Sequence, residues 1–364
     1  MARRWTALVA VTLAAASCSA VSDPGSGDSA RGRPDSASAA CAGRPDTAKQ
    51  PLSELLTGCY RGLPGGLYPG ATNAMPAAHL AGGQAAAAQI QPLDAGGGPS
   101  AAGKVVLLSI GMSNTTQEFC SEGGAPGSCE PWSFMGQAAA DPTVNHATLL
   151  IVNGARGGQA APSWVSPASA EYDRIRDQVL RPQGLSERQV QVAWVKVANA
   201  GPTRALPDTA ADAYALERQL GEIARALKVR YPNLRQLFLS SRIYAGYARS
   251  TLNPEPYAYE SAFAVRWAIG SQIDQMRGSA GSPRTGDLRY GTGGAGVWMA
   301  WGPYLWAAGM QPRADGLTWA PGDFAADGTH PARGARQKVG ALLLAFFKTS
   351  EVTRCWFLAG QRCG

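Results

Sequence analysis

The alternation of apolar runs with longer amphipathic stretches, which begins near residue 104, is the feature that most restricts the fold of this chain. Runs rich in Val, Ile and Leu predict buried strands at 105–110, 148–152, 190–197 and 234–240. The longer stretches predict helices at 168–180, 210–231, 257–276 and 332–347. Because strands alternate with helices, we predict one α/β domain whose parallel sheet is covered by helices on both faces.

A serine follows the first predicted strand directly, in the sequence VVLLSIGMSN, where it is Ser113. Ligands of open α/β sheets bind outside the carboxyl ends of the strands, so Ser113 is a candidate nucleophile. Gly, Ser and Asn are also common turn residues, and the motif taken alone is more typical of a turn. The interpretation therefore depends on a suitable base elsewhere in the chain.

The chain contains three histidines, and one of them has the spacing of a catalytic base. His330 follows Asp327 by three residues in DGTHP, just before the last predicted helix. A carboxylate and an imidazole at this spacing can project from a single loop, as the base of a serine hydrolase requires. The alternative is an Asp-Gly turn that caps the helix. We expect structural roles for His79, in the N-terminal region, and for His146, which precedes the second strand.

Two further loops could stabilise a developing oxyanion. The second predicted strand leads into NGARGG, in which Gly158 allows close approach of backbone N–H groups. The third leads into VANAG, in which the side-chain amide of Asn199 is a possible donor. Each segment can also be read as an ordinary loop. Together, the ends of three successive predicted strands carry a serine, a glycine and an asparagine, and the Asp-x-x-His segment before the last predicted helix completes the set.

These four motifs, in this order, resemble those of the SGNH (GDSL-type) hydrolase superfamily. GMSN is similar to its first block, which implies that Ser113 is the nucleophile. NGARGG and VANAG are similar to the second and third blocks, which implies that Gly158 and Asn199 contribute to the oxyanion hole. DGTH is similar to the last block and implies that His330 is the base and that Asp327 orients it.

The resemblance covers roughly residues 104–348 and implies a flavodoxin-like α/β/α sandwich with five parallel strands in the order 2-1-3-4-5. The GxSN start and the Gly-Gly pair lean toward the carbohydrate-esterase branch, whose members remove acetyl groups from sugars. Two positions depart from the family pattern. Met112 stands where aspartate is common, and Ala200 follows Asn199 where many relatives have Asp.

We therefore expect a serine esterase that hydrolyses short acyl esters, acetyl esters above all, on a carbohydrate. No metal or organic cofactor is implied. The alternatives are a lipid or thioester hydrolase with the same triad, and a non-catalytic polysaccharide-binding protein of the cell envelope. An α/β-hydrolase is disfavoured because GMSNT lacks the final glycine of that nucleophile motif.

Candidate substrate-binding residues surround these motifs. Arg156 and Arg242 follow strands and could bind a substrate carboxylate or phosphate, although ordinary surface charge is an equal alternative. Trp164 follows the second block, and a group of tryptophans precedes the His330 loop, namely Trp298, Trp301, Trp306 and Trp319. We expect one or two of these rings, Trp164 and Trp301 in particular, to form an aromatic platform for sugar rings. Packing beneath loops is the alternative.

The N-terminal sequence predicts export. Residues 1–17 combine a basic start with an apolar segment too short to span a membrane, as in a signal peptide. Cys18 follows small residues and resembles the acylated cysteine of a bacterial lipoprotein, exposed in the periplasm or on the cell surface. Plain secretion is the alternative. Residues 18–40 predict a flexible tether, 41–103 a loop-rich cover, and 104–364 the catalytic domain.

The remaining six cysteines agree with export to an oxidising compartment. They form three pairs that are local in sequence, and none has the CxxC spacing of a zinc site. The predicted disulfides are Cys41–Cys59, Cys120–Cys129 and Cys355–Cys363.

Charge gives little support for macromolecular partners. The chain has 33 basic and 26 acidic residues, a formal net charge of +7, but the basic residues are scattered and not interleaved with aromatics. Nucleic-acid binding is therefore not expected. We expect a monomer that contacts a membrane only through a lipid on Cys18.

Overall fold

The computed structural model describes residues 41–120 and 129–363. The predicted signal peptide, the tether and Cys18 lie outside the described residues. No helix in the described ranges is long and apolar enough to cross a membrane.

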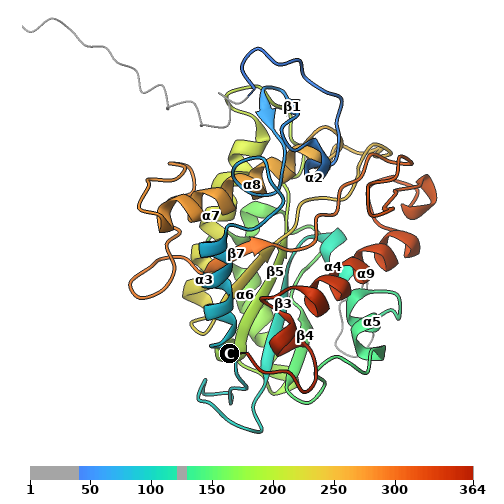
Figure 1. Ribbon diagram of the computed structural model, residues 1–364. Helices are drawn as coiled ribbons and strands as arrows, with labels where there is room; N and C mark the ends of the chain where they lie inside the picture. The colour runs from blue at the N-terminus through green and yellow to red at the C-terminus, as the bar shows by residue number, and fades with distance from the viewer. Residues whose placement is uncertain (1–40, 121–128, 364) are drawn as a thin grey trace, which may run out of the picture. The chain divides into compact units, whose positions relative to one another are not determined.

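A five-stranded parallel sheet forms the centre of the fold (Figure 1). Its strands lie in the order β4 (Leu149–Asn153), β3 (Val105–Gly111), β5 (Val190–Lys196), β6 (Gln236–Leu239) and β7 (Trp298–Trp301), and every neighbouring pair is parallel. Counted along the chain within this sheet alone, the order is 2-1-3-4-5. The predicted fold class is confirmed.

Both faces of the sheet are buried. Successive side chains of each strand point to opposite sides, and helices pack against each side. Leu108 packs into one hydrophobic cluster with α7 (Asp212–Arg230) and α8 (Tyr257–Met276). Leu107 packs into a second cluster with α9 (Arg333–Thr349). Figure 1 shows α7 and α8 on the opposite side of the sheet from α9. This is the three-layer α/β/α arrangement that the resemblance to the SGNH hydrolases implies.

The predicted elements are present with small shifts, with one change of type and one omission. The stretch predicted as a helix at 168–180 is an α-helix, α6 (Ala170–Arg174), followed by a π-helix over Ile175–Leu180. The fifth strand, β7, was not located from the sequence. It is only four residues long and contains two tryptophans, so its composition resembles a binding surface as much as a strand.

Residues 41–103 contain a hairpin of two short strands and two helices. These elements are α2 (Leu52–Leu55), β1 (Cys59–Tyr60), β2 (Leu63–Pro64) and α3 (Ala77–Ala87). The segment contributes to the main core, since the buried Tyr60 donates a hydrogen bond to Glu260 of α8 at 2.9 Å. At the other end of the segment, the carbonyl of His79 accepts a hydrogen bond from the indole of Trp298 in β7 at 2.9 Å. The predicted cover is therefore packed into the fold.

The three predicted disulfides, Cys41–Cys59, Cys120–Cys129 and Cys355–Cys363, are confirmed. Each closes a short segment, with sequence separations of 18, 9 and 8 residues. The second joins the end of α4 (Ser113–Phe119) to the segment before α5 (Phe134–Ala140).

Candidate active site

Ser113 is the first residue of α4, which begins two residues after β3 ends. The turn between them requires a glycine at position 111, because a Cβ there would overlap the Lys196 carbonyl and the Thr115 side chain. The Thr115 hydroxyl donates to this same carbonyl at 2.6 Å. The start of α4 is thereby fixed against the end of the neighbouring strand β5, with the Ser113 side chain partly exposed.

The loop before α9 brings His330 to Ser113. The Ser113 Oγ and His330 Nε2 atoms are 2.9 Å apart, and His330 Nδ1 is 2.5 Å from Asp327 Oδ2. The three side chains thus form one chain of hydrogen bonds. This is the geometry that the sequence predicts for a nucleophile, its base and the carboxylate that orients the base.

Backbone groups hold the Asp327 carboxylate in place. Its Oδ1 atom accepts hydrogen bonds from the backbone N–H groups of Thr329 at 2.9 Å and His330 at 3.0 Å. Burial alone raises the pKa of Asp327, but the hydrogen bonds from the backbone and ring of His330 and from Thr329 outweigh it and lower the pKa to about 2. Asp327 is therefore a carboxylate near neutral pH.

A hydrogen bond between the start of α4 and the loop of His330 was not anticipated from the sequence. The side-chain amide of Asn114 donates to the Thr329 carbonyl at 3.0 Å and is buried. The residue after the candidate nucleophile therefore binds the residue before the candidate base. Its adjacency to Ser113 is the only sequence signal that could have indicated this role.

The second-block loop lies against Ser113 through Gly157. A Cβ on Gly157 would be 3.8 Å from the Ser113 Cβ, whereas a Cβ on Gly158 would meet nothing within 4 Å. Gly158 has a φ of 81°, which favours glycine, and within the described ranges neither N–H forms a hydrogen bond. Both N–H groups are thus candidates for the oxyanion hole, and Gly157 adjoins the nucleophile more closely than the predicted Gly158.

Asn199 follows β5 at the same edge of the sheet, three residues after Lys196, which pairs with Gly111. Its side-chain nitrogen donates to Asp212 Oδ1 at 3.0 Å. Its carbonyl oxygen in the backbone accepts from the side chain of Asn253 at 3.0 Å. Neither partner was identified from the sequence, because no motif links Asn199 to a residue 13 or 54 positions further on.

A fully buried ion pair lies beneath Ser113. Lys196, the last residue of β5, contacts both carboxylate oxygens of Glu118 on α4. The distance from Lys196 Nζ to Glu118 Oε1 is 2.5 Å, and both side chains are 0% exposed. Burial lowers the pKa of Lys196 to about 8, although the Glu118 carboxylate opposes this effect. The lysine within the otherwise apolar run VQVAWVK was the available sequence signal for this pair.

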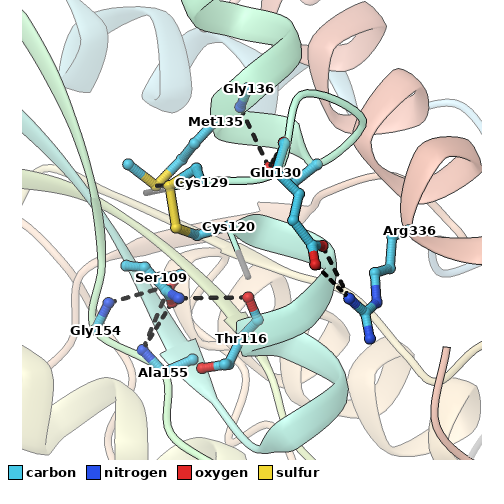
Figure 2. Close-up of a disulfide and its surroundings, with 12 residues drawn as sticks. Ser109, Thr116, Cys120, Cys129, Glu130, Met135, Gly136, Gly154, Ala155 and Arg336 are labelled. Carbon is cyan, nitrogen blue, oxygen red and sulfur yellow. Dashed lines mark hydrogen bonds and ion pairs between the residues drawn. A yellow bond between two sulfur atoms is a disulfide. The ribbon is translucent and has the colours of Figure 1, made fainter. Parts of the chain in front are cut away.

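A second ion pair links the segment after α4 to α9. Figure 2 shows the Cys120–Cys129 disulfide next to Glu130, whose two oxygens contact Arg336 of α9 at 2.8 Å each. Arg336 also donates from Nε to the carbonyl of Pro331 at 2.8 Å. The disulfide, the ion pair and this hydrogen bond connect the end of α4 to the residue that follows His330.

Three of the four predicted substrate-binding side chains are buried, which corrects the expectation for them. The ring of Trp164 is 0% exposed and donates to the Gln159 carbonyl. Trp301 is 3% exposed in β7 and donates to the Leu67 carbonyl of the N-terminal segment. Arg242 is 1% exposed.

The other tryptophans near the His330 loop are buried as well, namely Trp298, Trp306 and Trp319. The predicted aromatic platform is therefore wrong, because these rings fill the core beneath the loops. Arg156 is the exception among the four predicted residues, with a side chain that is 57% exposed and only 3.3 Å from Glu171.

His79 and His146 lie outside this constellation. Burial lowers the pKa of His79 to about 4, and its Nε2 is 2.9 Å from the Met299 carbonyl in β7. His146 precedes β4, and its Nε2 is 2.9 Å from the Asp141 carbonyl. Among the residues that the structure describes, no group of three or more His, Cys, Asp or Glu side chains could hold a metal ion.

No protein-family model and no curated protein sequence matches this chain. Several solved structures are similar in part. An acetyl-xylooligosaccharide esterase from Geobacillus stearmophilus is 12% identical, with 69% of this chain and 98% of that chain covered and a TM-score of 0.36. An extracellular lipase from Streptomyces rimosus is 10% identical, with coverages of 66% and 99% and a TM-score of 0.32.

A family two carbohydrate esterase from Cellvibrio japonicus is 11% identical, with coverages of 69% and 62% and a TM-score of 0.33. Similarity at this level assigns no activity to the chain. The interpretation of the site rests on the geometry of its own residues.

The buried pair gives a prediction about stability. We expect Lys196→Met to lower the free energy of unfolding by about 3–5 kcal/mol, because it leaves the Glu118 carboxylate buried without its partner. Adding Glu118→Leu should recover part of this loss, since no unpaired carboxylate then remains. Urea denaturation measures both effects, with Arg218→Met, which removes an exposed pair with Glu222, as a control expected to cost about 0–1 kcal/mol. Equal midpoints for Lys196→Met and the wild type would contradict the prediction.

Asp327 gives a prediction about pH. Its pKa falls from an ordinary value of 3.8 to about 2 in the folded protein, so its ionised form favours folding above pH 3.8 and this contribution is lost as the pH falls through 2. We expect the wild type to melt at a higher temperature than Asp327→Asn at neutral pH. The difference should shrink as the pH falls from 3.8 to 2. A difference that stays constant over this range in thermal melts would exclude this linkage.

Proposed function

We propose that this protein is a serine ester hydrolase. The observation that carries the proposal is the chain of hydrogen bonds from Ser113 through His330 to Asp327, with Ser113–His330 and His330–Asp327 distances of 2.9 Å and 2.5 Å. A positioned imidazole next to a partly exposed hydroxyl at the carboxyl edge of a parallel sheet is the arrangement that acyl transfer requires.

In the proposed reaction, Ser113 Oγ forms a bond to the ester carbonyl carbon while His330 Nε2 accepts the hydroxyl proton. The tetrahedral intermediate collapses when the alcohol leaves with the proton from His330, and an acyl group remains on Ser113. Water then adds to this acyl group as His330 again accepts a proton. The acid leaves and Ser113 recovers its hydrogen. Asp327 stabilises the imidazolium in both halves of the cycle.

The oxyanion of each intermediate would be stabilised by N–H donors from three elements. These are the backbone of Ser113, the backbone of Gly157 or Gly158, and the side-chain amide of Asn199. The N–H groups of the glycine pair support this assignment, because neither has an acceptor among the residues that the structure describes. Met112 does not weaken the proposal, because the hole needs only the backbone N–H of the following serine.

For the substrate, we propose a short acyl ester, an acetyl ester above all, on a carbohydrate. The GMSN and Gly-Gly motifs support this choice, whereas the buried tryptophans remove the support expected from an aromatic platform. Arg156 remains the candidate to contact an anionic group of the substrate, because it is exposed and precedes Gly157, the glycine next to Ser113.

The test is hydrolysis of acetyl, longer acyl and thioester substrates by the purified mature protein. We expect Ser113→Ala and His330→Ala each to reduce turnover by at least about 10³-fold, because the triad acts as a unit. Ser279→Ala, an exposed serine in the loop after α8, is the matched control and should retain activity.

Each possible result separates the candidate functions. Faster turnover of acetyl esters than of long-chain esters or thioesters supports the carbohydrate-esterase proposal, and the reverse preference supports a lipid or thioester hydrolase. Activity that survives Ser113→Ala refutes the assignment of the nucleophile. A wild type that is inactive on every substrate would leave a polysaccharide-binding protein as the function.

We further propose that the protein is exported and carries a lipid on Cys18. The three disulfides support an oxidising compartment. We expect the wild type to partition into detergent, and Cys18→Ala to move to the aqueous phase, because the acylated thiol is lost. If both partition alike into detergent, lipid modification at Cys18 is refuted and plain secretion is the better interpretation.

A further inference from the structure

We infer that Asp212 is the positioning residue that turns the side-chain amide of Asn199 so that its nitrogen, and not its oxygen, serves the oxyanion hole. The inference rests on the proposed function and names a residue that no motif of the chain indicates. Asp212 is 13 residues beyond Asn199 and begins α7, a helix of 19 residues that packs against α8.

The contacts of Asn199 are unequal at the two ends of its amide. The nitrogen donates to Asp212 Oδ1 at 3.0 Å, whereas the amide oxygen is buried and has no hydrogen-bond partner among the described residues. A buried oxygen without a partner costs about 1–3 kcal/mol. An interaction that depends on the orientation of the amide is therefore needed to keep the oxygen in this unpaired position.

The carboxylate of Asp212 supplies that interaction in its ionised form, which accepts hydrogen bonds and cannot donate one. Burial raises the pKa of Asp212, and the hydrogen bond from Asn199 opposes this effect. If the amide of Asn199 turned over, its oxygen would face Asp212 Oδ1, and two acceptors would meet. The observed orientation leaves the second N–H bond of the same nitrogen without an acceptor in residues 41–120 and 129–363. This N–H is the one that the proposed mechanism uses.

Asp212 is itself held firmly. Its backbone N–H donates to the Arg204 carbonyl at 2.9 Å, and Asn199 is fixed from the opposite side by Asn253, which donates to its backbone carbonyl at 3.0 Å. The residue after Asn199 is Ala200, which carries no carboxylate. The carboxylate next to the oxyanion amide therefore comes from the start of a helix.

The sharpest variant is Asp212→Asn, which keeps the size of the side chain but can donate as well as accept. The new amide can donate to the oxygen of a turned Asn199, which gives that oxygen the partner it lacks. We therefore expect kcat to fall by about 10- to 100-fold, a large part of the 10²–10³-fold that one oxyanion donor provides. KM should change by less than about twofold and thermal stability should not fall, because the fold gains a hydrogen bond.

The experiment is a double-mutant cycle on an acetyl ester with Asp212→Asn, Asn199→Ala and the two combined. If Asp212 acts through Asn199, the combined variant is no slower than Asn199→Ala alone. Asp208→Asn, at an exposed acid in the segment before α7, is the matched control and should match the wild type. Asp212→Ala serves as a second variant with the same expected cycle, should Asp212→Asn not fold.

Three results would overturn the inference. They are an unchanged kcat in Asp212→Asn, a full multiplicative loss in the combined variant, and an unchanged kcat in Asn199→Ala. Failure of the proposed function looks different, because turnover then does not depend on Ser113. Turnover that depends on Ser113 but shows independent effects at positions 199 and 212 refutes only the role of Asp212.

Discussion

The contact between Lys196 and Glu118 is the interaction on which the geometry of the candidate site depends most. Two charges with no exposure are stable together only because each neutralises the other and because the lysine reaches both carboxylate oxygens. The pair joins the last residue of β5 to the helix that begins with Ser113. With the Thr115 hydroxyl on the Lys196 carbonyl, it ties α4 to the sheet at two points one helical turn apart.

The parallel sheet then collects the remaining groups at one edge. All five strands run in the same direction, so the segments after β3, β4 and β5 emerge together, and these carry Ser113, Gly157 and Asn199. The fourth segment is the loop of His330, which precedes α9. This helix packs on α4 and α5 and thereby fixes the loop. The site therefore needs only short local motifs, because the sheet supplies their proximity.

This division explains what could be predicted from the sequence. Strand ends, the Asp-x-x-His spacing and the three disulfides are local patterns, and the triad geometry and the cysteine pairs follow them. The carboxylate of Asp212 could not be predicted, because its contact with Asn199 exists only after α7 has folded back over the sheet.

The burial of the tryptophans near the His330 loop was not predicted, for a related reason. Composition does not say whether an indole is covered, and here the N-terminal segment covers β7, with the carbonyls of Leu67 and His79 accepting from Trp301 and Trp298.

The buried charges around the nucleophile also bear on the proposed chemistry. Arg242 is buried, and Glu118 and Asp327 are among the carboxylates that favour its charged form. With Lys196, these groups are two cations and two anions, and the Asp212 carboxylate lies beside Asn199 as a further acid. Glu255, which also acts on Arg242, has its own partner in Lys49 at 3.6 Å.

The proposed reaction creates charges in pairs. In the proposed mechanism, the imidazolium of His330 and the oxyanion appear at the same step, so the total charge of the site does not change. Separate groups stabilise the two charges, the Asp327 carboxylate for the imidazolium and the N–H donors for the oxyanion. The ion pair beneath Ser113 and the Thr115 hydrogen bond hold the start of α4 against the end of β5.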